Sequence, residues 1–548
     1  MTLKRVEPRA EILAYGPSMY IRLPNSEDRD LTPEEVIALA SGMTFKDKNA
    51  RDLAIDALNV TSAEAEKEGG QSFEAYIKKS LMNSALRGHA SLTTSAGLWV
   101  LFNDSSKHVD SMFTGAQFAS GLMPSGRRIP ISLENIFAPE SVLRSDRETQ
   151  ELYERVSRAN VSLYLDLLDK GLPKEEVAKL VQYGLSGGGF MFIPLETLLQ
   201  YDQEFSEQRN FVPDEGLSLI AQLKEQLMGI GMSNLYAARA AAARNTPPFP
   251  FIYSDPRKSN LIDTMVERNR SRFRYLQPFV FGHGFGSGYM LYNALDELLE
   301  VEARIKQTPE GVLTGWREAL AKRRDVSSRF RDAMDYISLS KVAWRVWGEV
   351  KRHRTVPQQV QSIHQAAEKA NATFALYEDL IAPGKLDEQT VIIIGEVMAI
   401  PASVKANPDY LLPWLTCAKD SFRAYKELIQ RGIPAGDASS ILPRGTLVNV
   451  LKRLDTYQVL DGYLPLRMCG TCEPEMRATT RAEARAIQDL LPEKYRSLVH
   501  AKCFAGFCFE PHKQYEKCGQ AGVGLGFKYD KGLHDAVRAR QINAFEEF

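Results

Sequence analysis

Two stretches of the chain, at 162–184 and 421–443, follow the same plan, and this internal similarity limits the possible folds more than any other feature. They read SLYLDLLDKGLPKEEVAKLVQYG and SFRAYKELIQRGIPAGDASSILP. In each stretch, a helical pattern containing aromatic residues ends at a glycine, and the next segment begins at a proline. The shared plan indicates that the chain contains two diverged copies of one folding unit.

Length and patterning agree with this division. A chain of 548 residues is longer than one domain usually needs, so we expect two domains. A short strand pattern at 11–15 and helical patterns such as 147–170 predict an α/β or α+β fold, with a sheet packed with helices in each domain. We place the first domain at 1–215, a mostly helical connecting region or the start of the second copy at 216–330, and the second domain at 331–548.

The composition argues against several classes of protein. The formal net charge is -1 and charged residues make up 25%, a balance that argues against extensive nucleic-acid binding. No apolar run is long enough to span a bilayer, so we expect no membrane partner. The first residues, MTLKRVEPRAEI, lack the apolar segment of a signal peptide. These features predict a soluble, cytoplasmic protein.

The second half contains three short motifs, RHR at 352–354, RGIPAGDASSILP at 431–443 and YLPLRMCGTCEPEMR at 463–477. Their order resembles that of the flavin-dependent thymidylate synthases, whose signature R-H-R-x-x-S-x-N-E-x-S-x-R-Y precedes G-[IV]-P, D-A-R-x-[IV]-L-P and L-R-x-x-x-x-A-Q-x-E-I. The positions that fall into this pattern are Arg352, His353, Arg354, Ser362, Asp437, Ala438, Ile441, Leu442, Pro443, Leu466, Arg467 and Glu475. The remainder of the R-H-R signature departs from the family.

The first half resembles the same family less closely. The segment GHAS at 88–91 is similar to the family's G-H-x-S, and GAQFASGLMPSGRR at 115–128 aligns with the R-H-R signature. In this alignment Gly-Ala-Gln replaces the triplet, whereas Ser125 and Arg127 retain its S-x-R end. The resemblance therefore implies two tandem domains of the thymidylate-synthase-complementing type.

The resemblance also implies an activity, the reductive methylation of dUMP to dTMP. The implied cofactor is FAD, with methylenetetrahydrofolate and NADPH as co-substrates. The family's L-R arginine, which corresponds to Arg467, stabilises the uracil ring as its N3 anion, a role suited to a planar, permanently charged guanidinium. The positions implied to bind the cofactor are Arg352, His353, Arg354, Ser362 and His89, and those implied to bind the nucleotide are Ser125, Arg127, Lys179, Arg352 and Arg467.

The positions retained in the two copies complement each other. The second copy keeps the triplet and Arg467, but Ser439 and His364 stand where the family has its D-A-R and S-x-R arginines. The first copy lacks the triplet, keeps Arg127 and has Lys179 for the D-A-R arginine. We therefore predict a composite site between the copies, in a homodimer that forms a tetramer-like assembly. The alternatives are a related one-carbon transfer, such as hydroxymethylation of a pyrimidine nucleotide, and a non-catalytic nucleotide-binding or assembly relative.

The six cysteines all lie in the last quarter of the chain. Cys469 and Cys472 form a C-x-x-C pair, and Cys503 and Cys508 form a second pair further along. Two such pairs are compatible with a tetrahedral zinc site, whose ligands would be these four thiolates. The alternative is that the cysteines are buried as small hydrophobic residues.

Overall fold

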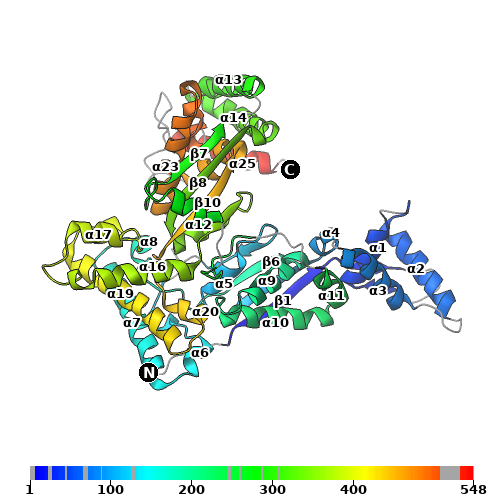
Figure 1. Cartoon of the computed structure of the whole chain (residues 1–548). Helices are drawn as coiled ribbons and strands as arrows, with labels where there is room; N and C mark the ends of the chain where they lie inside the picture. Colours follow the sequence, from blue (N-terminus) through cyan, green and yellow to red (C-terminus); the bar gives the residue numbers. More distant parts are fainter. Residues whose placement is uncertain are drawn as a thin grey trace. The chain divides into compact units, whose positions relative to one another are not determined.

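The computed structural model describes residues 7–22, 28–43, 46–65, 72–87, 89–124, 130–242, 249–257, 261–284, 288–305, 308–505 and 531–546. The chain divides into two compact units, and each contains one four-stranded sheet (Figure 1). Unit 1 comprises Met1–Arg257, Ser362–Leu386 and Pro401–Arg444, and unit 2 comprises Lys258–Gln361, Asp387–Ile400 and Gly445–Phe548. Both units are therefore built from segments that are separated in the sequence.

The first sheet, in unit 1, has the strand order β1-β4-β6-β5, and every neighbouring pair is antiparallel. Its strands are β1 (Arg9–Gly16), β4 (Gly97–Asn103), β5 (Ser120–Leu122) and β6 (Gly189–Pro194). Alternate side chains of a strand point to opposite faces, and Leu98, Val100, Met191 and Ile193 are buried on one of them. Helix α10 (Asp214–Gly229) packs against β1. The strand predicted at 11–15 lies within β1.

The second sheet, in unit 2, has the order β7-β8-β10-β9 and is also antiparallel throughout. Its strands are β7 (Phe279–Gly284), β8 (Met334–Ala343), β9 (Gln358–Val360) and β10 (Leu447–Asp455). Helix α23 (Pro474–Leu490) packs against β7 and β8. The two sheets share one topology, because in each the last strand along the chain lies between the second and the third. The predicted α+β fold, with helices packed on a sheet in each half, is confirmed.

Unit 1 also contains two helical modules with the same lengths. They are α6 (Glu140–Leu143), α7 (Arg147–Asp169) and α8 (Lys174–Val177), and α18 (Ala402–Lys405), α19 (Pro408–Gln430) and α20 (Ala435–Ala438). In both modules the long helix has 23 residues and the short helices have four. Helices α7 and α19 pack against each other. The repeated phrases found in the sequence cover the end of the long helix, the second short helix and the residues that follow it in each module.

The two modules also end in the same way. Gly171 follows α7 with a φ of 82°, and Gly432 follows α19 with a φ of 89°. After each glycine, the next amide donates back to a carbonyl in the last turn of the helix. Glycine adopts this left-handed conformation without steric cost, and it commonly ends helices in this way. An antiparallel bridge between Gln182 and Pro443 joins the segments that follow. The two modules thus share their helix lengths and their helix ends, and the duplication inferred from the sequence stays a prediction.

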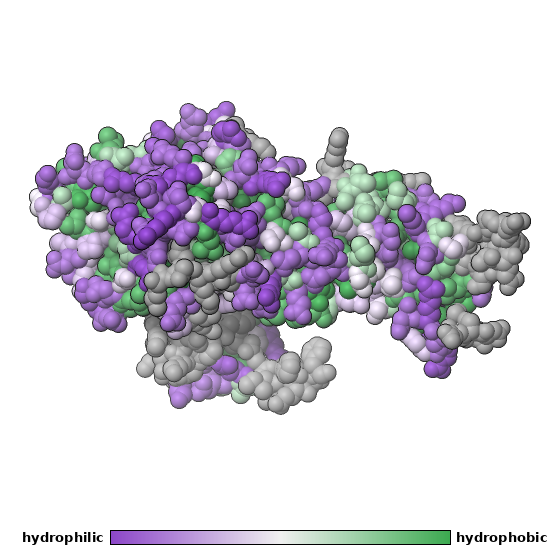
Figure 2. Space-filling model, turned by 90° about the horizontal axis from the view of Figure 1, so that it is seen from below, coloured by the Kyte–Doolittle hydropathy of each residue, from purple (hydrophilic) through white to green (hydrophobic). Residues whose placement is uncertain are grey.

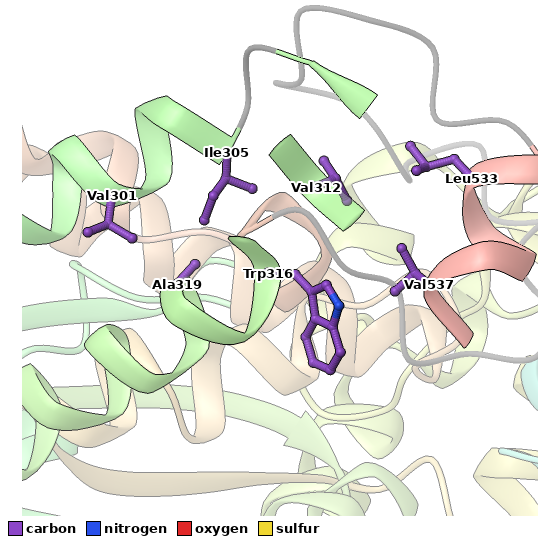
Figure 3. Close-up of a cluster of buried hydrophobic side chains, with 7 residues drawn as sticks. All are labelled: Val301, Ile305, Val312, Trp316, Ala319, Leu533 and Val537. Carbon is purple, nitrogen blue, oxygen red and sulfur yellow. The ribbon is translucent and has the colours of Figure 1, made fainter. Parts of the chain in front are cut away.

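Further elements of unit 1 are β2 (Met19–Ile21), β3 (Arg29–Leu31), α1 (Pro33–Gly42), α2 (Ala50–Ala65), α3 (Phe73–Ser84), α4 (Ala90–Thr94), α5 (His108–Phe113), α9 (Leu195–Glu207), α11 (Ser233–Ala241) and α16 (Ile363–Leu376). Further elements of unit 2 are α12 (Leu261–Arg268), α13 (Gly288–Ile305), α14 (Pro309–Arg329), α15 (Trp344–Val350), α17 (Glu388–Ile394), α21 (Thr456–Leu460), α22 (Tyr463–Arg467) and α25 (Lys531–Glu546). In unit 2, α13, α14 and α25 share an apolar cluster around Trp316 (Figure 3).

Each compact unit combines segments from both halves of the chain. The compact units therefore do not test the predicted domain boundaries, which stay a prediction. Strand β7 lies within 216–330 and opens the second sheet, so this region supplies part of the second fold. None of the helices in the described part of the chain is both long and apolar enough to cross a bilayer. The surface seen in Figure 2 is mostly hydrophilic, with smaller hydrophobic areas between.

Candidate functional site

The R-H-R triplet lies in unit 2, directly after α15. This helix buries its two tryptophans and two valines, and Glu349, near its end, is half-buried. A backbone hydrogen bond of 3.0 Å from His353 N to Val350 O turns the chain out of the helix. Within the triplet, Arg352 is exposed and Arg354 is half-buried. The turn therefore carries an exposed arginine directly before the partly buried histidine and a half-buried arginine directly after it.

Arg467 joins the triplet at the end of α22. Its Nε donates a hydrogen bond of 2.5 Å to His353 Nε2. Its Nη1 donates to Glu349 Oε2 at 2.8 Å, and its Nη2 donates to the backbone oxygen of the same glutamate at 3.1 Å. The structure thus brings together the histidine of the R-H-R triplet and the arginine of the L-R phrase, whereas their implied roles stay a prediction. It adds Glu349, which the sequence analysis did not single out.

The imidazole of His353 is held in its neutral form. Burial, followed by the positive charges of Arg467 and Lys452, lowers its pKa to about 3. Because Arg467 Nε is always a donor, His353 Nε2 must be the acceptor, and the ring proton therefore sits on Nδ1. The ring stands edge-on to Tyr463, with centroids 5.1 Å apart. The tautomer of this histidine is thus fixed by its arginine neighbour.

A buried polar cluster lies beneath this histidine. Lys452 Nζ donates to Tyr463 Oη at 3.0 Å, and the tyrosine donates to Glu483 Oε2 at 3.1 Å. Lys452 and Glu483 form an ion pair in which neither side chain is exposed, and Ser338 Oγ also donates to the glutamate. Burial is the main cause that raises the pKa of Tyr463 well above its ordinary value. This buried ion pair is thus held by hydrogen bonds from Tyr463 and Ser338, and Tyr463 also packs against the imidazole of His353.

Glu475, the glutamate of the L-R phrase, fixes the start of α15. Its Oε1 accepts a hydrogen bond of 2.7 Å from Ala343 N. In unit 1, Glu215 Oε1 accepts one of 2.6 Å from Ser106 N, shortly before α5. Each glutamate lies in the first turn of a helix that packs on its sheet. Glu475 binds the last residue of β8, and Glu215 binds the backbone shortly after β4. The sequence analysis missed Glu215 because the first copy lacks the L-R phrase that marks its counterpart.

Glu215 and Asp437 also line a pocket of about 410 Å³ in unit 1. Asp437 accepts hydrogen bonds of 2.5 Å from Ser141 Oγ and 2.9 Å from Asp214 N. Burial raises the pKa of Glu215 to about 7 against the hydrogen bonds from Ser106, and it raises that of Asp437 to about 6. The pocket lining consists of Glu7, Pro8, Arg9, Phe137, Pro139, Glu140, Arg144, Pro213, Asp214, Glu215, Ser218, Gln222, Asp437 and Ser440.

Other predicted site residues belong to unit 1. Ser362 is buried and donates to Ser254 O at 2.6 Å. His364 is buried between Tyr425 Oη and Phe211 O, each 2.8 Å from a ring nitrogen. The end of the signature in the second copy is therefore part of the packed core of this unit. Lys179 is buried and His89 is exposed. Ser125 and Arg127 lie outside the described residues.

The cysteines have separate surroundings. Cys472 Sγ lies 4.0 Å from Arg467 Nη1, and Cys469 Sγ lies 3.3 Å from Thr471 Oγ1. Cys503 packs against the apolar cluster of α13, α14 and α25, as expected for a small hydrophobic residue. Cys508 lies outside the described residues, and among the described ones no three His, Cys, Asp or Glu side chains are grouped to hold a metal. The zinc site stays a prediction.

The segment that contains this site matches the model of a known protein family. Residues 297–493 match the family model described as thymidylate synthase complementing protein. This segment includes the R-H-R triplet, the D-A phrase and the L-R phrase, together with strands β8, β9 and β10. The resemblance inferred from the motifs is confirmed for this part of the chain.

Two individual proteins are similar to parts of this chain, one over a short segment and the other at low sequence identity. The flavin-dependent thymidylate synthase of Pyrococcus furiosus is 29% identical over 92 residues, which are 17% of this chain and 36% of that protein. The chain thus spans about a third of the length of this curated relative. A solved structure, the UMP/dUMP methylase PolB from Streptomyces cacaoi bound with 5-Br dUMP, is 12% identical with a TM-score of 0.31. Its alignment covers 45% of this chain and all of that chain.

Proposed function

We propose that this protein is a flavin-dependent thymidylate-synthase-like enzyme that methylates dUMP to dTMP. The hydrogen bond between His353 and Arg467 carries this proposal, because it joins two family motifs that lie 114 positions apart in the chain. Both residues lie within the segment that matches the family. The carbon donor would be methylenetetrahydrofolate, and NADPH would supply the electrons.

The residues around the triplet fit a ligand that offers several acceptors, such as FAD or a nucleotide. Arg352 is exposed and Arg354 is half-buried, so two guanidinium groups lie where they can reach phosphate or ring oxygens. His353 contributes a neutral N–H donor. Bound FAD would supply the hydride for reduction. The residues of this chain would bind the nucleotide, orient its ring beside Arg467 and keep the site partly closed to water.

We further propose that the first copy completes the site with Ser125 and Arg127. In the second copy, Ser362 and His364 are engaged in internal hydrogen bonds, so phosphate donors would have to come from elsewhere. The common strand order and the paired helical modules support an origin of both copies from one ancestral domain. A homodimer would then assemble four copies of this domain, as expected for a tetramer-like body.

A second candidate function is a non-catalytic nucleotide-binding relative. The internal engagement of His364 favours it, because an arginine at this position would present a permanent charge to phosphate, whereas the buried histidine is neutral. Burial lowers the pKa of His364 to about 4.

The test is an assay of the purified full chain with dUMP, methylenetetrahydrofolate, FAD and NADPH, with products identified by mass spectrometry. We expect dTMP from the wild type and no product from Arg467→Ala. The control is Arg331→Ala, which removes an exposed arginine that pairs with Asp455 in the same unit and should leave turnover unchanged. A 5-hydroxymethyl product would favour the related one-carbon transfer. Nucleotide binding without turnover, in protein that binds FAD, would favour the non-catalytic relative.

A further inference from the structure

The positive charge of Arg467 is balanced inside the site. Its guanidinium lies 2.8 Å from the carboxylate of Glu349, and the two side chains are only 19% and 18% exposed. An ion pair that is largely shielded from water interacts more strongly than an exposed pair. A further anion close to Arg467 would therefore meet a guanidinium whose charge is already compensated by its neighbour.

The same contacts use most of the hydrogen-bonding capacity of Arg467. Three of its nitrogens donate to His353 Nε2, Glu349 Oε2 and the backbone oxygen of Glu349. The guanidinium is thereby fixed in one orientation, because the carboxylate and the carbonyl hold opposite ends of its fork. Loss of the carboxylate alone would release one of these ends.

His353 receives its donor role from this arrangement. Because its Nε2 accepts from Arg467, its Nδ1 carries the proton. Within the part of the chain that the structure describes, this Nδ1 has no hydrogen-bond partner. A half-buried N–H group without a partner is suited to an acceptor on a ligand, such as a carbonyl oxygen.

We propose that Glu349 is the positioning residue of this site, which orients and neutralises Arg467 so that His353 offers its Nδ1–H to a carbonyl oxygen of an uncharged heterocyclic ring. The ligand class that the geometry selects here is the ring of a pyrimidine or a flavin, and not its phosphate. The proposal rests on the proposed function for the identity of the ring, and it concerns the ring as it binds, before the N3 anion that the resemblance implies would form. The positioning of Arg467 and His353 by Glu349 does not depend on a ligand.

The ligand-free part is tested by nitrogen NMR of histidine-labelled protein, with the His353 signals assigned from a His353→Asn variant. The wild type should show the Nδ1–H tautomer over the neutral pH range. Glu349→Ala should release Arg467 and give a mixture of both tautomers, whereas Glu318→Gln, which removes an exposed carboxylate paired with Arg304, should change nothing. An Nε2–H tautomer in the wild type, or an unchanged tautomer in Glu349→Ala, would overturn the proposal.

The ligand part compares deoxyuridine, dUMP and inorganic phosphate by titration calorimetry. Glu349→Gln keeps the size of the side chain and removes its charge, so binding of dUMP and phosphate should tighten about fivefold and become more salt-dependent. Binding of deoxyuridine should not tighten. Equal changes for deoxyuridine and phosphate would contradict the assignment to an uncharged ring. If the wild type binds no nucleoside or nucleotide, the proposed function fails, and the NMR result alone decides the role of Glu349.

Discussion

Glu215 and Asp437 should make the stability of unit 1 depend on pH in the neutral range. Both carboxyl groups are buried, and burial raises the pKa of Glu215 from 4.5 to about 7 and that of Asp437 from 3.8 to about 6. The folded state therefore holds these protons when the unfolded state has released them. Their contribution to stability is fully present below the unfolded pKa values, and it is lost as the pH rises through the folded pKa values.

The magnitude follows from the difference between the two states. Each pH unit of difference corresponds to about 1.4 kcal/mol, so the raised pKa of Glu215 implies a loss of about 3 kcal/mol in the free energy of unfolding as the pH rises from about 4.5 to about 7. The raised pKa of Asp437 implies a loss of similar size in the free energy of unfolding, over a pH range that begins lower, at 3.8. The negative charge of Asp437 contributes to the raised pKa of Glu215, so the two losses are coupled and their sum is smaller than the separate values suggest.

Urea unfolding of the full chain at a series of pH values measures this effect. Glu215→Gln keeps the size of the side chain and cannot titrate, so its free energy of unfolding should change less between about pH 5 and about pH 7 than that of the wild type, by up to about 3 kcal/mol. Glu151→Gln, which removes an exposed carboxylate paired with Arg147, should follow the wild type. Parallel curves for the wild type and Glu215→Gln would refute the reasoning.

Two further perturbations test the fold. Gly171→Ala and Gly432→Ala place a side chain at a positive φ and should each reduce the free energy of unfolding by about 1–2 kcal/mol. Gly229→Ala, at the last residue of α10 with open space around it, should not reduce it. Equal midpoints of urea unfolding for all three variants would contradict the matched helix ends. Arg323→Met removes the guanidinium that donates a hydrogen bond of 2.6 Å to the buried carboxylate of Glu302. Thermal or urea unfolding should therefore show a free energy of unfolding lower by about 3–5 kcal/mol. A decrease under about 1 kcal/mol would mean that this buried pair is not formed.

The sequence was sufficient where a motif carries its own local geometry. The glycine and proline of the repeated phrases end one helix and begin the next through backbone constraints alone, so the corresponding ends of α7 and α19 could be predicted. The contact between His353 and Arg467 could be anticipated because both belong to motifs of the resembled family. In contrast, Glu349 has no motif of its own, and its role depends on a contact with a residue 118 positions away.

Burial explains most of what the sequence could not show. Ser362 was assigned to the cofactor and His364 was aligned with the arginine of the family's S-x-R end, but a sequence does not reveal whether such a side chain faces a cavity or a core. The structure places His364 between Phe211 and Tyr425, from segments far apart in the chain. The interleaving of the compact units is equally hidden, since it depends on which helices pack together and not on where either copy begins.

The segment of unit 1 that the sequence alignment pairs with the triplet is unsuited to a second triplet site. Gly115 and Ala116 stand where the sequence alignment places the first two residues of the triplet, after α5 as the triplet follows α15. Ala116 is fully buried, and a Cβ added at Gly115 would lie 3.1 Å from Pro250 O. Arginine side chains at these positions would have to displace packed residues or bury an uncompensated charge, and both are costly. In unit 1, this turn is therefore part of the core, whereas the turn after α15 in unit 2 carries the arginines and the histidine of the triplet.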